Sequence, residues 1–287
     1  LYRFSQSRHQ NIVRPFDYFI FRNHICLTFE CLGPNTLTIY RNSKFTSAKV
    51  QSLAYHLFQG LNHCHKLNII HCDIKPENIL KVPNQNQTTI SQSFYNSNVS
   101  ISTISCNSED SYKIVDFGSS CFFGKQRFDY IQSRYYRAPE VILGTPYNQS
   151  IDIWSAALVI IEVLLQRPLF PGKSESEVLS LILNTLGLPP LKMIHSARKY
   201  RNYLESILKS RSNHLSLSID NQGTHYRPIR NFLNTLDCCH GDNLLIDFLA
   251  RCLTWDPDET MTAEEALHHP WMAFKYSESN TLPDLIH

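Results

Sequence analysis

The chain has 287 residues, of which 43% are hydrophobic and 18% charged, and its formal net charge is +2. This length and composition are those of a globular protein that can bury a sizeable core. The basic residues are scattered, so no nucleic-acid partner is expected, and the longest apolar run, residues 158–165, is too short to span a membrane. Nine cysteines without a CxxC pair favour a reducing compartment, so we expect a cytoplasmic and/or nuclear protein.

Two short strands are predicted near the start of the chain. Residues 16–21 (FDYFIF) and 25–30 (ICLTFE) are β-branched and aromatic, and a turn-like RNH separates them. From residue 48 to residue 64 the apolar residues recur at helical spacing, and further helices are predicted over residues 152–165, 174–186, 244–253 and 263–268. A few strands followed by many helices predict an α+β fold whose second part is mainly helical.

One segment differs in composition from the rest. Residues 83–111 are dense in Asn, Gln, Ser and Thr and show no hydrophobic period, which predicts a disordered low-complexity insertion on the surface. The apolar runs on either side, residues 78–80 and 112–115, are expected to pair as a hairpin, because a long loop adds little closure entropy.

The strongest chemical signal is the segment IIHCDIKPENIL at residues 69–80. Phosphoryl transfer needs a carboxylate that positions the attacking hydroxyl and accepts its proton, a cation near the transferred group, and oxygen ligands for Mg²⁺. Asp73, Lys75 and Asn78 supply these three roles at the spacing of a kinase catalytic loop, although Cys72 stands where the usual pattern has Arg.

A second signal is the tripeptide DFG at residues 116–118, which follows a short predicted strand. Alone it is weak, because it arises by chance in many chains. Here it follows the catalytic loop and precedes APE at residues 138–140 by about the interval of a kinase activation segment. Asp116 is therefore predicted to be the second Mg²⁺ ligand.

These blocks resemble the dual-specificity tyrosine-regulated protein kinases. The resemblance is carried by HCDIKPENIL at 71–80, DFGSSC at 116–121 and YIQSRYYRAPEVILG at 130–144, and that family has the same Cys in its catalytic loop. PLFPG at 168–172 and LGLPP at 186–190 are similar to its Yak-type branch. The resemblance covers nearly the whole chain apart from the insertion and about residues 195–240, and it implies a protein kinase-like fold.

The resemblance also implies a nucleotide site, with ATP and Mg²⁺ as cofactors and proteins as substrates of a monomeric enzyme. Phe29 is expected at the back of the adenine pocket, with the hinge following it and Leu80 on the pocket floor. The residues implied to bind the nucleotide are Phe29, Glu30, Cys31, Leu32, Asn35 and Leu80.

Regulation follows from the same likeness. Tyr130 matches the tyrosine that this family phosphorylates on itself, and Arg134 and Arg137 are placed to pair with its phosphate. Cys72 cannot bind phosphate as an Arg would, which agrees with a phosphate held by these two arginines instead. Asp152 matches a buried aspartate that organises the catalytic-loop backbone.

The sequence departs from the kinase pattern near its start. It has no Gly-x-Gly-x-x-Gly, no Val-Ala-Ile-Lys strand and no Glu-bearing helix before residue 16, and residues 7–13 resemble the segment just after that helix. We therefore expect an N-terminally truncated chain that binds ATP poorly as it stands. Residues 1–32 are interpreted as the last strands of an incomplete N-lobe with the hinge, residues 33–275 as the C-lobe, and residues 276–287 as a tail.

A further departure concerns a buried carboxylate. Thr260 stands where the family has an Arg that pairs with Glu140 of the APE motif, and Arg251 is the candidate substitute. Losing such a buried partner costs on the order of 3–5 kcal/mol. Two functions are therefore open: a serine/threonine protein kinase, or a pseudokinase scaffold that binds partners without catalysis. The catalytic-loop and metal residues are all present, which favours the enzyme.

Overall fold

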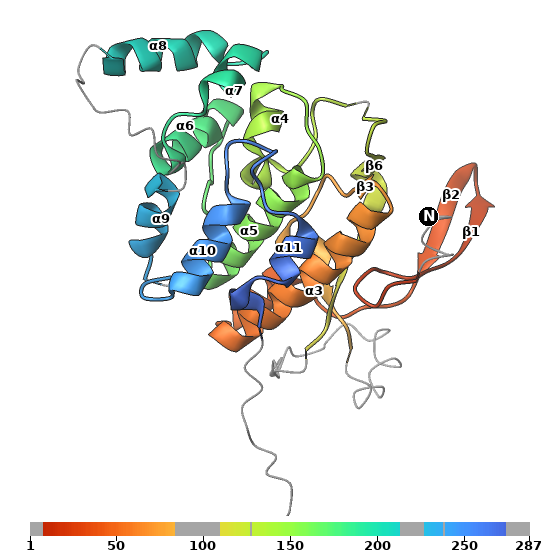
Figure 1. Ribbon diagram of the computed structural model, residues 1–287. Helices are drawn as coiled ribbons and strands as arrows, with labels where there is room; N and C mark the ends of the chain where they lie inside the picture. Colours follow the sequence, from red (N-terminus) through yellow and green to blue (C-terminus); the bar gives the residue numbers. More distant parts are fainter. Residues whose placement is uncertain (1–7, 84–109, 127, 213–226, 238, 274–287) are drawn as a thin grey trace, which may run out of the picture.

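The computed structural model describes residues 8–83, 110–126, 128–212, 227–237 and 239–273 (Figure 1). The predicted tail and residues 84–109 of the predicted insertion lie outside these residues. The predicted end of the insertion at residue 111 is wrong, because Asp110 is buried and the Ser111 carbonyl accepts a hydrogen bond from the backbone N–H of Val82 at 2.8 Å. The strands are β1 (Pro15–Phe21), β2 (His24–Phe29), β3 (Ile69–Ile70), β4 (Ile79–Lys81), β5 (Tyr112–Ile114) and β6 (Cys121–Phe122). The helices are α2 (Thr36–Asn42), α3 (Ser47–Lys66), α4 (Pro139–Leu143), α5 (Ser150–Leu165), α6 (Glu175–Leu186), α7 (Leu191–Ser196), α8 (Arg201–Ser212), α9 (Arg227–Asn234), α10 (Asn243–Cys252) and α11 (Ala263–Leu267). The predicted α+β class is confirmed.

Strands β1 and β2 form an antiparallel hairpin in which Ile20 pairs with Ile25. Arg22 and Asn23, at the turn, have φ values of 47° and 60°, and two left-handed residues in a two-residue turn match the right-handed twist of the flanking strands. Both predicted strands are present within one residue of their expected bounds. Figure 1 shows the hairpin standing to one side of the helical body.

The helical body is built around α5. Nearly every side chain of this helix is buried, as expected of a helix that is apolar on all sides and is packed at the centre of a core. Helix α3 packs against α5 and α11 and buries one face, which includes Leu53, Leu57 and Leu61. Its first turn is capped by the Thr46 hydroxyl, which accepts a hydrogen bond from the backbone N–H of Lys49.

Two short hairpins connect this core to the sequence motifs. β3 pairs with β6, and β4 pairs with β5 with Leu80 opposite Lys113, so the pairing predicted across the insertion is confirmed. The end of the β4–β5 hairpin from which the insertion leaves is closed by a buried ion pair between Lys81 Nζ and Asp110 Oδ1 at 2.7 Å. The catalytic loop and the DFG segment lie at the opposite end.

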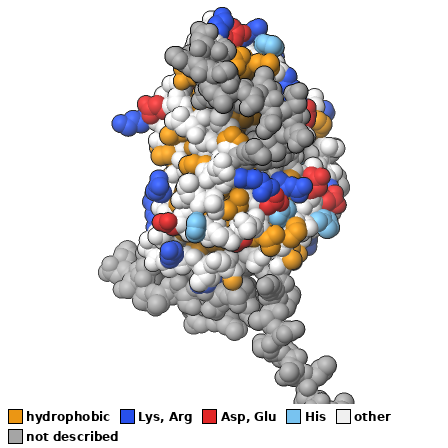
Figure 2. All heavy atoms as spheres, turned by 60° about the vertical axis from the view of Figure 1, so that its left-hand side comes forward, with side chains coloured by type: hydrophobic (Ala, Val, Ile, Leu, Met, Phe, Trp, Pro, Cys, Tyr) orange, Lys and Arg blue, Asp and Glu red, His pale blue; other side chains and the backbone are white. Residues whose placement is uncertain are grey.

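The helices carry charge of both signs on their outer surfaces. On the part of the face in Figure 2 that is not grey, Lys and Arg side chains are interspersed with Asp and Glu, and neither sign gathers into one patch. Among the described residues, no helix is both long enough and apolar enough to cross a membrane.

Candidate active site

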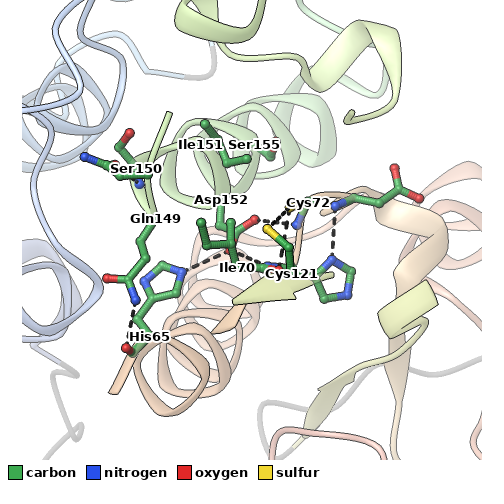
Figure 3. Close-up of polar contacts among 12 residues, drawn as sticks. His65, Ile70, Cys72, Cys121, Gln149, Ser150, Ile151, Asp152 and Ser155 are labelled. Atoms are coloured by element: carbon green, nitrogen blue, oxygen red, sulfur yellow. Dashed lines mark hydrogen bonds and ion pairs between the residues drawn. The ribbon is translucent and has the colours of Figure 1, made fainter. Parts of the chain in front are cut away.

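The catalytic loop is held in place by one buried carboxylate. Asp152, in the first turn of α5, is fully buried and accepts hydrogen bonds from the backbone N–H groups of His71 at 2.8 Å and Cys72 at 3.0 Å. Its Oδ2 also lies 3.0 Å from His65 Nε2 on α3 (Figure 3). Cys72 has a left-handed backbone with φ of 65°, which a non-glycine residue keeps only when its surroundings fix it. Asp152 therefore has the organising role predicted from the sequence.

Cys72 has a sulfur neighbour that the sequence did not reveal. Its Sγ lies 3.7 Å from Sγ of Cys121, which sits on β6 directly after the DFG segment (Figure 3). The hydrogen bond between the two thiols and burial both raise the pKa of Cys72, while the same bond lowers the pKa of Cys121 to about 7. Cys72 therefore serves as a buried apolar side chain within the catalytic loop.

Asp73, the predicted catalytic base, has a cation on one oxygen and a hydroxyl on the other. Oδ2 accepts from Lys75 Nζ at 2.7 Å and from Asn78 Nδ2 at 3.2 Å. Oδ1 accepts from Ser133 Oγ at 2.7 Å and from its backbone N–H at 3.2 Å. Burial raises the pKa of Asp73, but the hydrogen bonds from Lys75 and Ser133 outweigh it and hold that pKa below its ordinary value. The carboxylate is thus ionised at neutral pH.

The two predicted metal ligands are brought close together by the β4–β5 ladder. The backbone N–H of Val115 donates to the carbonyl of Asn78 at 3.0 Å, which places Asn78 one residue away from Asp116 across the hairpin. Asn78 Nδ2 donates to the Asp73 carbonyl at 2.9 Å, so its Oδ1 is left for another ligand. Asp116 is exposed and has φ of 63°. Two neighbouring oxygen-bearing side chains are a donor set that suits Mg²⁺.

A cavity of about 910 Å³ lies between the β1–β2 hairpin and the C-lobe. Its walls are mostly apolar, with Asp116 among the few charged groups, which is the usual character of a ligand site. Of the six residues predicted to bind the nucleotide, Phe29, Glu30, Leu32 and Leu80 line it. The other lining residues are Val13, Leu27, Ile69, Val115, Asp116, Phe117, Gly118, Ser120, Cys121 and Phe122.

Cys31 and Asn35, also predicted to bind the nucleotide, are not among these lining residues. Cys31 is exposed on the hinge. The Asn35 side chain accepts a hydrogen bond from the backbone N–H of Thr38 at 2.8 Å and so caps α2. Nucleotide contact by these two residues stays a prediction.

The first hinge residue is fixed by an ion pair between distant segments. Lys113 Nζ on β5 lies 2.6 and 2.8 Å from the two carboxylate oxygens of Glu30, and the backbone N–H of Arg14 donates to the same carboxylate at 2.6 Å. Both side chains of the ion pair are mostly buried, at 15% and 21% relative exposure. The hinge is therefore tied to the strand that leads into the DFG segment, a link that the sequence did not indicate.

The three predicted regulatory residues meet on the activation segment. Tyr130 is exposed, and the guanidinium carbon of Arg137 lies 4.2 Å from the centre of its ring. Hydrogen bonding by Arg137, and then by Arg134, lowers the pKa of the Tyr130 hydroxyl. Arg137 is itself buried and donates to Glu175 Oε1 at 2.9 Å and to the Gln132 carbonyl at 2.7 Å.

Glu140 of the APE motif is buried without a cation. It is 2% exposed and accepts a hydrogen bond from Ser150 Oγ at 2.9 Å, and no Lys or Arg in the described part of the chain forms an ion pair with it. Burial raises its pKa to about 7. Arg251, the candidate substitute partner, is exposed, and Thr260 instead bonds to the Thr254 hydroxyl at 2.5 Å.

Comparison with known proteins agrees with this geometry. A family model described as "Protein kinase domain" matches residues 2–272. Similar curated proteins include "Dual specificity tyrosine-phosphorylation-regulated kinase 3" of Mus musculus, 35% identical over 92% of this chain and 43% of that protein. Others are "Dual specificity tyrosine-phosphorylation-regulated kinase mbk-2" of Caenorhabditis elegans, 37% identical over 91% of this chain and 31% of that protein, and "Dual specificity tyrosine-phosphorylation-regulated kinase 2" of Drosophila melanogaster, 36% identical over 91% and 33%.

The chain spans less than half the length of each of these relatives. The family match nevertheless covers nearly all of the chain, including the catalytic loop, the DFG segment and the activation segment. With these segments assembled as described above, the chain belongs to the protein kinase domain family.

Proposed function

We propose that this protein is a serine/threonine kinase of the dual-specificity tyrosine-regulated family, and that it transfers the γ-phosphoryl group of ATP to hydroxyls of protein substrates. The observation that carries the proposal is the arrangement around Asp73. An ionised carboxylate lies between Lys75 and the Ser133 hydroxyl, one loop away from the oxygen ligands Asn78 and Asp116. This is the constellation that phosphoryl transfer to a hydroxyl requires.

Each of these residues has a separate task. Asp73 accepts a hydrogen bond from the attacking hydroxyl and takes its proton as the new oxygen–phosphorus bond forms and the bond from the γ-phosphorus to the bridging oxygen of the departing ADP breaks. Lys75, 2.7 Å from Asp73, stabilises the negative charge that builds up on the transferred group. Ser133 is hydrogen-bonded to Asp73 Oδ1 and fixes the orientation of the carboxylate.

The cavity next to these residues fits ATP and Mg²⁺. Its apolar walls suit an adenine ring, and the hinge backbone from Glu30 to Leu32 runs along its edge. Asn78 and Asp116 would hold Mg²⁺ with their side-chain oxygens. When bound, the cation neutralises charge on the phosphates and so lowers the barrier to attack.

Autophosphorylation of Tyr130 is the second part of the proposal. Arg134 and Arg137 already contact this exposed side chain, and a phosphate there gains charge-assisted hydrogen bonds from both. Cys72, a buried residue of the catalytic loop, offers no cation to such a phosphate. The ordering of residues 130–137 therefore depends on these two arginines.

Several finer expectations belong to the same proposal. We expect the protein to be monomeric and to be located in the cytoplasm and/or the nucleus. Residues 168–172 and 186–190 support its assignment to the Yak-type branch of the family.

Expression of the full-length protein in bacteria tests the proposal. Mass spectrometry should find phosphate on Tyr130 in the wild type and none in Asp73→Asn, and the purified wild type should phosphorylate serine or threonine in a generic substrate such as myelin basic protein. Tyr135→Phe, at another exposed tyrosine of the same segment, is the matched control for Tyr130→Phe and should retain activity. A full-length protein that transfers no phosphate to itself or to the substrate refutes the kinase proposal and leaves the scaffold.

A further inference from the structure

A second cavity, of about 460 Å³, lies behind the catalytic loop. It is enclosed by the end of α3, the start of α5 and residues 257–264, which lead into α11. We propose that this cavity binds the guanidinium group of an arginine side chain from a partner protein, and that binding there is transmitted to the catalytic loop. For brevity we call it the rear cavity.

The first argument is a missing positive charge. Glu140 is buried and has a neutral hydroxyl partner, Ser150, where a buried carboxylate is normally paired with a cation. Asp256 is also buried, and its charge adds to the factors that raise the pKa of Glu140. The cation on Asp256 is Lys192, whose own side chain is largely exposed. Among the described residues, Lys192 is therefore the single cation that pairs with either of these two buried carboxyl groups.

The rear cavity reaches this charged region. Ser150, which donates to Glu140, lines the cavity, and so does Thr260, whose hydroxyl donates to the Asp256 carbonyl at 3.2 Å. Ser150 is therefore shared between the cavity wall and the buried Glu140 carboxyl group, which does not itself line the cavity.

The rim adds a further acceptor. Asp258 lines the cavity, is exposed, and forms no ion pair with any described residue. The Lys66 ammonium on this wall is already engaged, because it pairs with Glu264 at 2.9 Å, and His65 is hydrogen-bonded to Asp152. A cation entering here thus meets one unpaired carboxylate at the rim and a second one behind the wall.

The neutral groups favour guanidinium over ammonium. Asn62 and Gln149 line the cavity, and no described residue donates a hydrogen bond to their side-chain oxygens. Two other lining side chains are already engaged, because Asn148 Oδ1 accepts from the Ser150 N–H at 2.7 Å and the Thr262 hydroxyl is bonded to Glu265. A guanidinium group carries five N–H donors in one plane and is more weakly hydrated than an ammonium, so it loses less on leaving water and satisfies more acceptors.

The link to the catalytic loop is direct. His65 lines the rear cavity and hydrogen-bonds to Asp152, which in turn holds the backbone of His71 and Cys72. Gln149 also lines it and donates to the His65 carbonyl at 2.8 Å. In Figure 3, His65, Gln149 and Ser150 lie on the opposite side of Asp152 from Cys72. A ligand that orders His65 and Gln149 therefore stabilises the loop anchor.

Thermal unfolding of the full chain tests the proposal without measuring kinase activity. N-acetyl-arginine amide, at about ten times its Kd and at constant ionic strength, should raise the melting temperature by about 3 °C. The lysine analogue should have a smaller effect, and the neutral citrulline analogue should have none. An equal shift with the citrulline analogue overturns the proposal.

Variants localise the effect. Glu140→Gln and Asp258→Asn should each reduce the response, and Thr260→Arg should raise the melting temperature without ligand and abolish the response by supplying the guanidinium from within. Thr260→Val, which is close in size to Thr and, unlike Thr260→Arg, adds no charge, is the control and should still respond. Deuterium exchange of the His71 and Cys72 amides should slow on binding. An unchanged response in Glu140→Gln and Thr260→Arg, or loop exchange that ligand does not alter, contradicts the inference.

Discussion

Replacing Asp152 by Asn tests the anchor of the catalytic loop with a change of one atom. The carboxylate accepts three hydrogen bonds, from the backbone N–H groups of His71 and Cys72 and from His65. The amide that replaces it keeps one acceptor oxygen. In its best orientation this oxygen takes the place of Oδ2 and serves His71 and His65, while the new NH₂ group faces the N–H of Cys72.

The expected loss of stability follows from these contacts. A hydrogen bond to a charged acceptor contributes about 1.5–3 kcal/mol, and a neutral acceptor contributes roughly half as much. Losing the bond to Cys72 and weakening the other two therefore lowers the free energy of unfolding by about 4 kcal/mol. Part of this is recovered because Asn carries no charge to bury, so we expect a net loss of about 3 kcal/mol. Cys72 is also freed from its left-handed conformation, so kcat should fall more than the KM for ATP rises.

Urea unfolding at equilibrium, followed by tryptophan fluorescence, measures the loss. The matched control is Asp242→Asn, because Asp242 caps α10 through Leu245 N–H at 2.9 Å and Asn caps a helix as well as Asp does. That control should unfold within about 0.5 kcal/mol of the wild type. An Asp152→Asn protein that is equally stable would show that the anchor contributes little, and the reasoning would be wrong.

Three further predictions concern other parts of the site. Ser133→Ala removes the hydroxyl that donates to Asp73, so the pKa of Asp73 should rise and kcat should fall roughly tenfold. The acid limb of the kcat–pH profile should move to higher pH, and an unshifted limb contradicts this prediction. Lys113→Met leaves the Glu30 carboxylate without its cation, so the KM for ATP should rise several-fold and the free energy of unfolding should fall by about 1–2 kcal/mol. An unchanged KM would show that the hinge does not need this ion pair. For Glu140, burial raises the pKa from 4.5 to about 7 in the folded state, so between these two pH values the folded chain holds a proton that the unfolded chain releases. The free energy of unfolding should therefore decline by about 3 kcal/mol as the pH rises from 4.5 to above 7. Glu140→Gln should remove that part of the pH dependence, and parallel stability–pH curves for the two proteins would refute it.

The parts of the site that sequence predicted are those whose partners are close in the chain. Asp73, Lys75 and Asn78 lie within six residues, so their mutual geometry is set by one loop. Ser133 contacts Asp73 across 60 residues, and Glu30 meets Lys113 across 83. Nothing in local spacing identifies such pairs, because the fold alone brings the segments together.

The helices divide in the same way. The 174–186 and 263–268 predictions match α6 and α11 closely, because Ser174 and Thr262 cap these helices and mark their starts. The short helices α2, α4 and α7 were not predicted, because five to seven residues are too few for a hydrophobic period to be recognised. They form where neighbouring elements position the backbone.

The ion pair between Lys81 and Asp110 has a consequence for how this gene can change. It closes the β4–β5 hairpin next to residues 84–109, while Asn78 and Asp116 lie at the other end of the same ladder. Residues 84–109 can therefore be shortened, lengthened or replaced by an epitope tag without moving the atoms that perform the chemistry. Changes of length and sequence should therefore be tolerated at this position, and a reporter domain can be inserted there.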